Sequence, residues 1–231
     1  MSDIAQFISE QDSHCLILAR HGETEWNAVG RLQGQQDTSL NEKGMGQASR
    51  VARLLAKVSI NQIHASTLQR SQKTAQPIAE QNINEPDIFP SPLLKETALG
   101  VLEGEMIAQQ STPELTRHYQ DFSRDEINYR IPNGENLHDV FARVERFFKA
   151  QDQLLKKTGV HVIVGHRNLN KMIIKYLLGL SFEDGFQVEH KHEQLYLYFG
   201  TRKELWFCGI NGAQSQFTQG HSTIEGGPSY A

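Results

Sequence analysis

The feature that most constrains this chain is a short apolar run, Cys15–Ala19, which ends abruptly in Arg20, His21 and Gly22. An apolar run of this length, bounded by polar residues and glycine, is typical of a buried strand in a parallel sheet. Open α/β folds bind their ligands at the carboxyl ends of such strands. An arginine beside a histidine at that position indicates a site that holds a phosphate group and attacks it.

Predicted strands and helices alternate along the rest of the chain. This order predicts a three-layer α/β/α sandwich around a mostly parallel sheet. Ser39 or Asn41 is expected to cap the helix that follows the first strand. Further strands are predicted near 62–65, 87–91 and 161–164. Helices are predicted near 68–81 and 137–157, and another helix follows the last of these strands and ends at Gly179. A hairpin is predicted over 195–199 and 204–208.

Two segments are expected to lie outside the layers. Residues 100–135 are predicted to form a small helical excursion that covers the active site. Within it, Thr112 is expected to cap a helix that begins at Pro113. Residues 1–208, with this excursion, are predicted to form a single domain. Residues 209–231 are rich in Gly, Ser and Gln, which predicts a flexible tail.

Composition narrows the class of protein. The chain has 231 residues and 38% hydrophobic residues, enough for a sizeable core. Its formal net charge of −4 gives no case for a nucleic-acid or membrane partner. The two cysteines, Cys15 and Cys208, are too few for a disulfide framework, and Met1–Ser13 lacks the pattern of a signal peptide. We therefore expect a cytoplasmic protein.

Four polar positions follow predicted strands and so should share one rim of the sheet. A neutral His21 can attack phosphorus and form a phosphohistidine. Donors for the phosphate oxygens are expected from the guanidinium groups of Arg20 and Arg70, and His166 adds a third cationic donor if it is protonated. Glu96 can protonate the leaving oxygen and later deprotonate water. This scheme needs a small phosphorylated substrate but no metal and no cofactor.

The motifs that carry these residues are those of a known family. They are Arg20-His21-Gly22-Glu23-Thr24-Glu25-Trp26-Asn27, Gly30-Arg31-Leu32-Gln33-Gly34, Ser66-Thr67-Leu68-Gln69-Arg70, Leu94-Lys95-Glu96 and Val164-Gly165-His166. In this order they closely resemble the histidine phosphatase superfamily, the phosphoglycerate-mutase-like group. The resemblance implies that His21 accepts the phosphoryl group, that Glu96 donates the proton, and that Arg20, Arg70 and His166 form the phosphate pocket. Further substrate contacts are expected from Glu23, Asn27, Gln33, Gly34, Arg167 and Asn168.

The sequence departs from the family pattern at two places, the residues after the second histidine and the segment before Glu103, which lacks the aromatic residue often found there. The family usually has glycine after the second histidine, whereas this chain has Arg167, which is expected to place an extra cation at the mouth of the pocket. Leaving-group selection is predicted to lie in the excursion, with Tyr119, Phe122, Arg124, Tyr129 and Arg130. His190 and His192 are interpreted as residues of a half-exposed strand edge, because no third metal ligand lies near them in the sequence.

Three functions remain open at this point. The first is a phosphomonoester hydrolase, which the Gly30–Gly34 loop favours. The second is a phosphoglycerate mutase, in which phosphate returns to a substrate. The third is an inactive phosphate-binding interaction module. The C-terminal hairpin could also pair with a second copy, so a homodimer is a further hypothesis.

Overall fold

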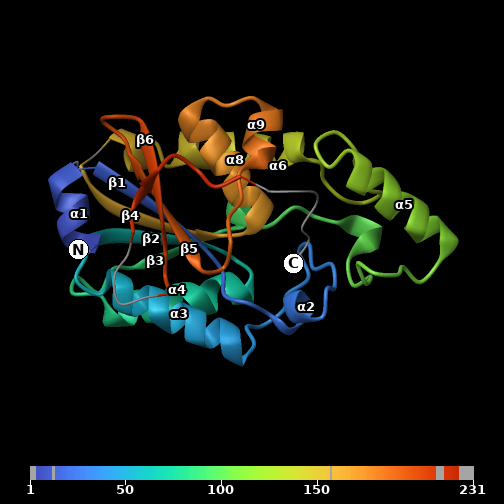
Figure 1. The fold of residues 1–231 in the computed structure, drawn as a ribbon, viewed down its shortest axis with the longest axis horizontal. Helices are drawn as coiled ribbons and strands as arrows, with labels where there is room; N and C mark the ends of the chain where they lie inside the picture. The colour runs from blue at the N-terminus through green and yellow to red at the C-terminus, as the bar shows by residue number, and fades with distance from the viewer. Residues whose placement is uncertain (1–3, 12–13, 157, 212–215, 224–231) are drawn as a thin grey trace.

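The computed structural model describes residues 4–11, 14–156, 158–211 and 216–223. Across these residues, seven strands form one sheet in the order β3-β2-β4-β1-β5-β6-β7 (Figure 1). The first four strands in this order are parallel, and β5, β6 and β7 are antiparallel to their neighbours. The strands are β1 (His14–Arg20), β2 (Ile60–Ser66), β3 (Ile88–Ser91), β4 (Gly159–Gly165), β5 (Gln194–Phe199), β6 (Glu204–Gly209) and β7 (Thr218–Gln219). The predicted α/β fold is confirmed.

Helices cover both faces of the sheet (Figure 1). One face carries α1 (Ile4–Gln11), α3 (Glu42–Leu55) and α4 (Gln69–Gln81). The other face carries α6 (Leu137–Ala150), α7 (Gln153–Lys156), α8 (Arg167–Leu178) and α9 (Phe182–Gln187). The remaining helical segments are α2 (Glu25–Ala28), α5 (Pro113–Arg124) and two 3₁₀ turns, η1 (Pro92–Leu94) and η2 (Gly100–Leu102). No described helix is long and apolar enough to cross a membrane.

The central strand β1 is buried along its whole length, which explains its unbroken apolar run. Leu16 and Leu18 face the core beneath α6 and α8, whereas Ile17 faces the core beneath α3 and α4. Each such side chain contributes about 1.5–3 kcal/mol through its removal from water. These two cores fix the strand on both faces and so fix where it ends.

The structure corrects the predicted helix over 137–157. The helix α6 ends at Ala150, and a turn separates it from the short helix α7. Leu154 of α7 packs into the same core as Val144 and Phe147 of α6. The apolar pattern therefore runs on through the turn, and it could not reveal the break. The helix α1 lies in the N-terminal stretch, for which no helix was predicted.

Part of the predicted tail pairs with the sheet. Thr218 and Gln219 form β7 against Phe207 and Trp206 of β6, and Thr223 bridges Val188. Residues 216–223 thus contact the rest of the fold, whereas residues 212–215 and 224–231 lie outside the described part, and the flexible tail stays a prediction. Since β7 covers part of the outer edge of β6, the hairpin is less open to a second copy than we expected. The single-domain organisation and the homodimer stay predictions.

The excursion forms a small core of its own beyond the end of the sheet. The helix α5 begins as predicted, because the Thr112 hydroxyl accepts a hydrogen bond from the Leu115 N–H at 3.2 Å. Phe122 packs there with Leu102 and Ile131. The segment lies at the opposite end of the molecule from α1, next to α2 (Figure 1). This position places it beside the carboxyl end of β1.

The first turn of α3 packs closely against the loop that carries the Arg-His-Gly motif. Asn41, and not Ser39, caps this helix, with its side chain accepting from the Gly44 N–H at 2.8 Å. A Cβ on Gly44 would lie 2.0 Å from the backbone oxygen of Glu23, and one on Gly22 would lie 2.4 Å from the oxygen of Gly44. The loop is thus held by contacts between backbones that leave no room for a side chain.

Gly44→Ala is expected to lower the free energy of unfolding by about 1–3 kcal/mol, because backbone has to move to admit the methyl group. Gly46→Ala, in the same helix, is the matched control, since the nearest atom to its Cβ is the far end of Arg50 at 3.6 Å. Alanine there should stabilise the helix by roughly 0.5–1 kcal/mol. Urea unfolding of both variants measures the difference, and equal midpoints would contradict the close contact.

Candidate active site

The pairing of β1 with β4 brings two histidines together. Arg20 lies opposite Gly165 in the parallel register, and the His21 N–H donates to the Gly165 oxygen at 3.1 Å. The rings of His21 and His166 are consequently only 5.0 Å apart between centroids. Both side chains are buried, with exposed fractions of 3% and 0%. The sequence prediction that these two residues share one rim is thus met by the geometry.

The His21 ring is oriented as a nucleophile requires. Its Nδ1 lies 2.7 Å from the carbonyl oxygen of Gly22. Because a carbonyl only accepts hydrogen bonds, Nδ1 carries the proton, and the Nε2 of a neutral ring keeps its lone pair. Burial lowers the pKa of His21 well below 6.5, and the nearby Arg70 and His166 lower it further. The ring is therefore neutral at pH 7.

Two buried guanidinium groups flank this ring. Arg70 opens α4 and donates to the backbone oxygens of Gln36 at 2.7 Å and Gly34 at 2.8 Å. Arg20 donates to the backbone oxygen of His190 at 3.1 Å. Burial lowers the pKa of Arg20 to about 9 and that of Arg70 to about 10. Buried cations of this kind favour the binding of an anion, which compensates for their lost hydration.

Unpartnered donors also face this region. Among the described residues, the buried Nε of Arg70 and the buried Nδ1 of His166 have no hydrogen-bond partner. The opposite nitrogen of His166, Nε2, lies 2.7 Å from the hydroxyl of Ser66, and this contact fixes the ring. Buried polar groups in native proteins are normally satisfied, so these atoms mark a place for an acceptor. The four oxygens of a phosphate group fit that need.

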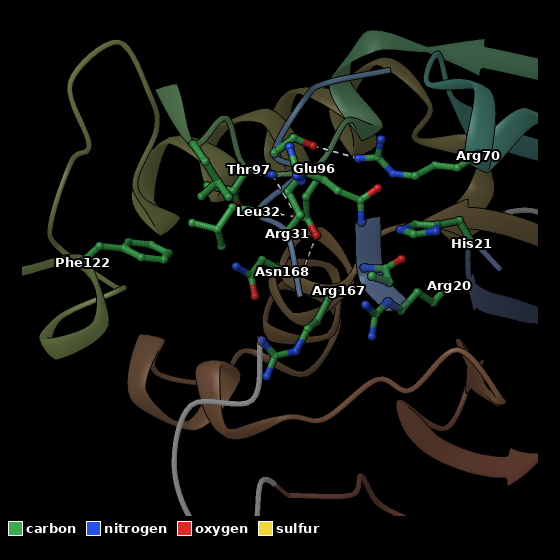
Figure 2. A pocket seen from close by; sticks show the side chains of 14 residues that line it. Arg20, His21, Arg31, Leu32, Arg70, Glu96, Thr97, Phe122, Arg167 and Asn168 are labelled. Atoms are coloured by element: carbon green, nitrogen blue, oxygen red, sulfur yellow. Dashed lines mark hydrogen bonds between the residues drawn. The ribbon is translucent and has the colours of Figure 1, made fainter. Parts of the chain in front are cut away.

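The Glu96 carboxylate lies at the N-terminus of α8. It accepts from the backbone N–H groups of Asn168 and Leu169, each at 3.2 Å, and from that of Thr97 at 2.9 Å (Figure 2). The loop that carries it is held by Arg143, which donates to the backbone oxygens of Leu93 at 2.7 Å and Lys95 at 3.0 Å. The carboxylate is thus fixed in place while it still lines the cavity.

A cavity of about 80 Å³ joins these groups. Figure 2 shows Arg20, His21 and Arg70 on one side and Phe122 across from them, with Arg167 and Asn168 between. The cavity is lined by Arg20, His21, Asn27, Arg31, Leu32, Gln33, Gly34, Arg70, Glu96, Thr97, Leu99, Phe122, Arg167 and Asn168. His166 does not line this cavity, although its ring centroid lies 5.0 Å from that of His21. Among the described residues, no group of three or more His, Cys, Asp or Glu side chains is arranged to hold a metal ion.

Glu23 does not lie where we predicted. Its carboxylate accepts from Lys43 at 2.7 Å and Asn41 at 3.0 Å, and it lines a different hollow of the surface. The chain turns after Gly22, so this side chain points towards the start of α3 and not towards His21. The other predicted substrate contacts, Asn27, Gln33, Gly34, Arg167 and Asn168, all line the cavity, and their contacts with a substrate stay predictions.

Most of the excursion residues expected at the pocket face elsewhere. Phe122 lines the cavity, but Arg124 pairs with Asp121 at 3.2 Å and Arg130 with Asp139 at 2.6 Å. Tyr129 shares a hydrogen bond with His118, and Tyr119 packs in the small core of the excursion. None of these four residues lines the cavity, and their part in selecting the leaving group stays a prediction. Arg31, from the loop after α2, takes a place there that the sequence reasoning did not assign.

His190 and His192 were also misread as residues of a strand edge. They lie between α9 and β5, where His192 donates from Nδ1 to the His21 carbonyl oxygen at 2.6 Å and His190 contacts Asn170 at 3.0 Å. Burial lowers the pKa of His190 to about 3 and that of His192 to about 2. Both rings therefore act as neutral supports for the motif. No local pattern reveals this, because it depends on β5 lying beside β1.

The fold and these side chains define an α/β sandwich with a cationic pocket at the carboxyl edge of its sheet. Residues 16–206 match the histidine phosphatase superfamily (branch 1). The chain belongs to this superfamily.

The names of its relatives give more than one activity. A probable phosphoglycerate mutase of Serratia proteamaculans is 35% identical over 71% of this chain and 75% of its own length. A metal-independent phosphoserine phosphatase of Arabidopsis thaliana is 36% identical over 64% of this chain and 62% of its own. The crystal structure of the α-ribazole phosphatase of Shigella flexneri has a TM-score of 0.69 and 25% identity, over 93% of this chain and all of that one. The chain is similar to each of these.

We expect the His21 ring to be neutral at pH 6.5, in the form protonated at Nδ1, because its pKa is lowered well below that value. NMR of the ring nitrogens in phosphate-free buffer measures this, with His21→Ala to assign the signal. Inorganic phosphate should raise the pKa, since a bound dianion stabilises the imidazolium. A ring that titrates at or above pH 6.5 without phosphate would contradict the described environment.

Proposed function

We propose that this chain is a metal-independent phosphomonoester hydrolase that works through a phosphohistidine on His21. The observation that carries the proposal is the neutral, oriented ring of His21 beside two buried guanidinium groups and a fixed carboxylate. A phosphoserine phosphatase among the relatives supports the same class of activity. The small cavity favours a small-molecule substrate.

In the first step, Nε2 of His21 attacks the phosphorus and the bond to the leaving oxygen breaks. Arg20, Arg70 and His166 donate to the non-bridging oxygens, where negative charge is held in the transition state. Glu96, in its protonated form, gives its proton to the leaving oxygen, so that a neutral alcohol departs. The enzyme is left with a phosphohistidine and a carboxylate.

In the second step, the Glu96 carboxylate takes a proton from a water molecule that enters in place of the alcohol. The water oxygen attacks phosphorus and the P–N bond breaks, which releases inorganic phosphate and restores the neutral His21. Glu96 ends protonated, ready for the next cycle. The backbone N–H groups of Thr97, Asn168 and Leu169 keep the carboxyl group in one position through both steps.

A cytoplasmic location is part of the proposal. Cys15 and Cys208 are both buried and are not joined in a disulfide, which is in keeping with a reducing compartment.

A phosphoglycerate mutase is the rival function, and the name of the Serratia relative favours it. In a mutase, the phosphohistidine must survive until a second acceptor hydroxyl takes the place of the first. This requires that water be kept out of the closed site. The short excursion, with one helix near the pocket, favours hydrolysis instead.

His21→Ala is expected to abolish phosphate release from a panel of phosphomonoesters, because the nucleophile is lost. In the wild-type protein, rapid quenching with a ³²P-labelled substrate should trap label on the protein in an acid-labile, alkali-stable form. The control is Glu145→Gln, on the exposed face of α6. Glu103→Gln would not serve as a control, because Glu103 accepts a hydrogen bond from the Gln35 N–H next to the site. Label on the His21→Ala protein would reject the assignment.

The same experiment distinguishes the hydrolase from the mutase and from an inactive binding module. Transfer of label from 2,3-bisphosphoglycerate to a phosphoglycerate, without release of inorganic phosphate, would favour the mutase. Tight binding of phosphate with no turnover of any compound would favour the binding module.

EDTA is expected to leave the rate of phosphate release unchanged, because the proposed steps draw on side chains alone. The rate is measured after dialysis against the chelator and again after addition of Mg²⁺, Mn²⁺ or Zn²⁺. Loss of activity that one of these ions restores would show that a metal takes part.

A further inference from the structure

Arg20 and His21 both contact a segment that has no regular structure of its own. Residues 188–193 join α9 to β5 and belong to neither a helix nor a strand. The backbone oxygen of His190 accepts from the Arg20 guanidinium at 3.1 Å, and His192 donates to the backbone oxygen of His21 at 2.6 Å. Whatever fixes this segment therefore also fixes the two side chains expected to contact the phosphate group.

The amide of Asn170, in α8, ties this segment to the end of β1. The side chain is fully buried, and its Nδ2 lies 3.1 Å from the backbone oxygen of Ala19 and 3.0 Å from Nδ1 of His190. The Ala19 carbonyl only accepts hydrogen bonds, so the amide turns its NH₂ group towards these two partners. The two hydrogens of Nδ2 are thus shared between the residue before Arg20 and the residue that anchors Arg20.

The contacts of His190 determine the state of its ring. Its Nε2 lies 3.0 Å from the backbone oxygen of Gln194, which only accepts, so Nε2 carries the hydrogen. The lone pair of Nδ1 is then left to accept from Asn170. A proton on Nδ1 would face the N–H of that amide, so Asn170 favours the neutral ring beside the cation of Arg20. The ring also packs edge-on against Tyr196, with centroids 4.9 Å apart.

The outer side of the segment has anchors that do not involve α8. The Tyr196 hydroxyl donates to the backbone oxygen of Glu189 at 2.6 Å, and the Glu189 N–H donates to the backbone oxygen of Ser222 at 2.9 Å. These contacts keep the segment attached to the fold when Asn170 is changed. The loss of Asn170 should therefore shift the His190 carbonyl relative to Arg20 without detaching the segment.

We propose that Asn170 is a positioning residue, which acts through His190 to hold the guanidinium of Arg20 where it contacts the phosphate group. The inference rests on the proposed function and extends it to two residues that do not line the cavity. Arg70 is held by the backbone oxygens of Gly34 and Gln36 instead, so it does not depend on this network. The helix α8 thus positions a phosphate donor through Asn170 as well as Glu96 through its first turn.

Asn170→Leu removes both donors while it nearly keeps the shape of the side chain. We expect it to weaken the binding of inorganic phosphate, measured by calorimetry, about 10- to 100-fold, because a hydrogen bond to a charged group has this strength. The control is Ile173→Ala, in the core-facing part of the same helix, which should destabilise the fold and leave phosphate affinity unchanged. Unchanged affinity in Asn170→Leu, or an equal loss in the control, would overturn the inference.

Double variants distinguish positioning of Arg20 from a general structural role. In an Arg20→Gln background, Asn170→Leu should have little further effect on phosphate affinity, because the group that it positions is already gone. In an Arg70→Gln background it should keep its full effect. A loss of the same size in both backgrounds would show that Asn170 does not act through Arg20, and would reject its assigned role.

His190→Phe tests the same network should Asn170→Leu fail to fold. It keeps a ring against Tyr196 but has no nitrogen to meet Asn170, so it should weaken phosphate binding by a similar factor. Full phosphate affinity in this variant would overturn the inference.

Phosphate binding also separates the inference from the proposed function. The expected losses of affinity in a protein that hydrolyses no phosphomonoester, p-nitrophenyl phosphate included, would support the inference and reject the hydrolase alone. Normal turnover with unchanged phosphate affinity in Asn170→Leu would reject the inference and leave the hydrolase intact.

Discussion

The site depends on the parallel pairing of β1 with β4. This pairing sets Arg20 opposite Gly165, so that the two strands end together and each delivers a histidine to the same point. A shift of one residue would turn the side chains of β1 to the opposite face of the sheet, and would bury polar groups in one of the two cores. The apolar cores on either side therefore specify the register, and through it the 5.0 Å separation of the rings of His21 and His166.

Neutral backbone groups position the charged side chains of the site. Arg70 is held by the backbone oxygens of Gly34 and Gln36, and Glu96 by backbone N–H groups at the start of α8. Carbonyl and amide dipoles carry only partial charges, so they orient these side chains without cancelling their charge. The field of the guanidinium groups stays available to a ligand. A bound anion should in turn stabilise the folded protein, since it binds the native state and not the unfolded chain.

The sequence was sufficient for the strands β1 to β6 and for the residues that follow the parallel strands, but not for β7. The strands β1 and β4 can be recognised by their apolar runs, Cys15–Ala19 and Val162–Val164, and a glycine follows each run within three residues. What it did not reveal depends on contacts between distant segments. His192 supports His21 only because β5 pairs with β1, and the break between α6 and α7 is hidden because Leu154 continues the apolar pattern. Glu23 was assigned by its place in a motif, whereas its direction follows from the packing of Gly22 on Gly44.

The first turn of α8 serves the site in two ways. Its backbone N–H groups at Asn168 and Leu169 hold the carboxylate of Glu96, and its first side chain, Arg167, lines the same cavity. Because both belong to one turn of helix, the carboxylate and this arginine are positioned together. A glycine at position 167 would keep the backbone contacts to Glu96 and remove an arginine from the cavity. The departure from the family pattern therefore changes the lining of the cavity, while the backbone that holds Glu96 is preserved.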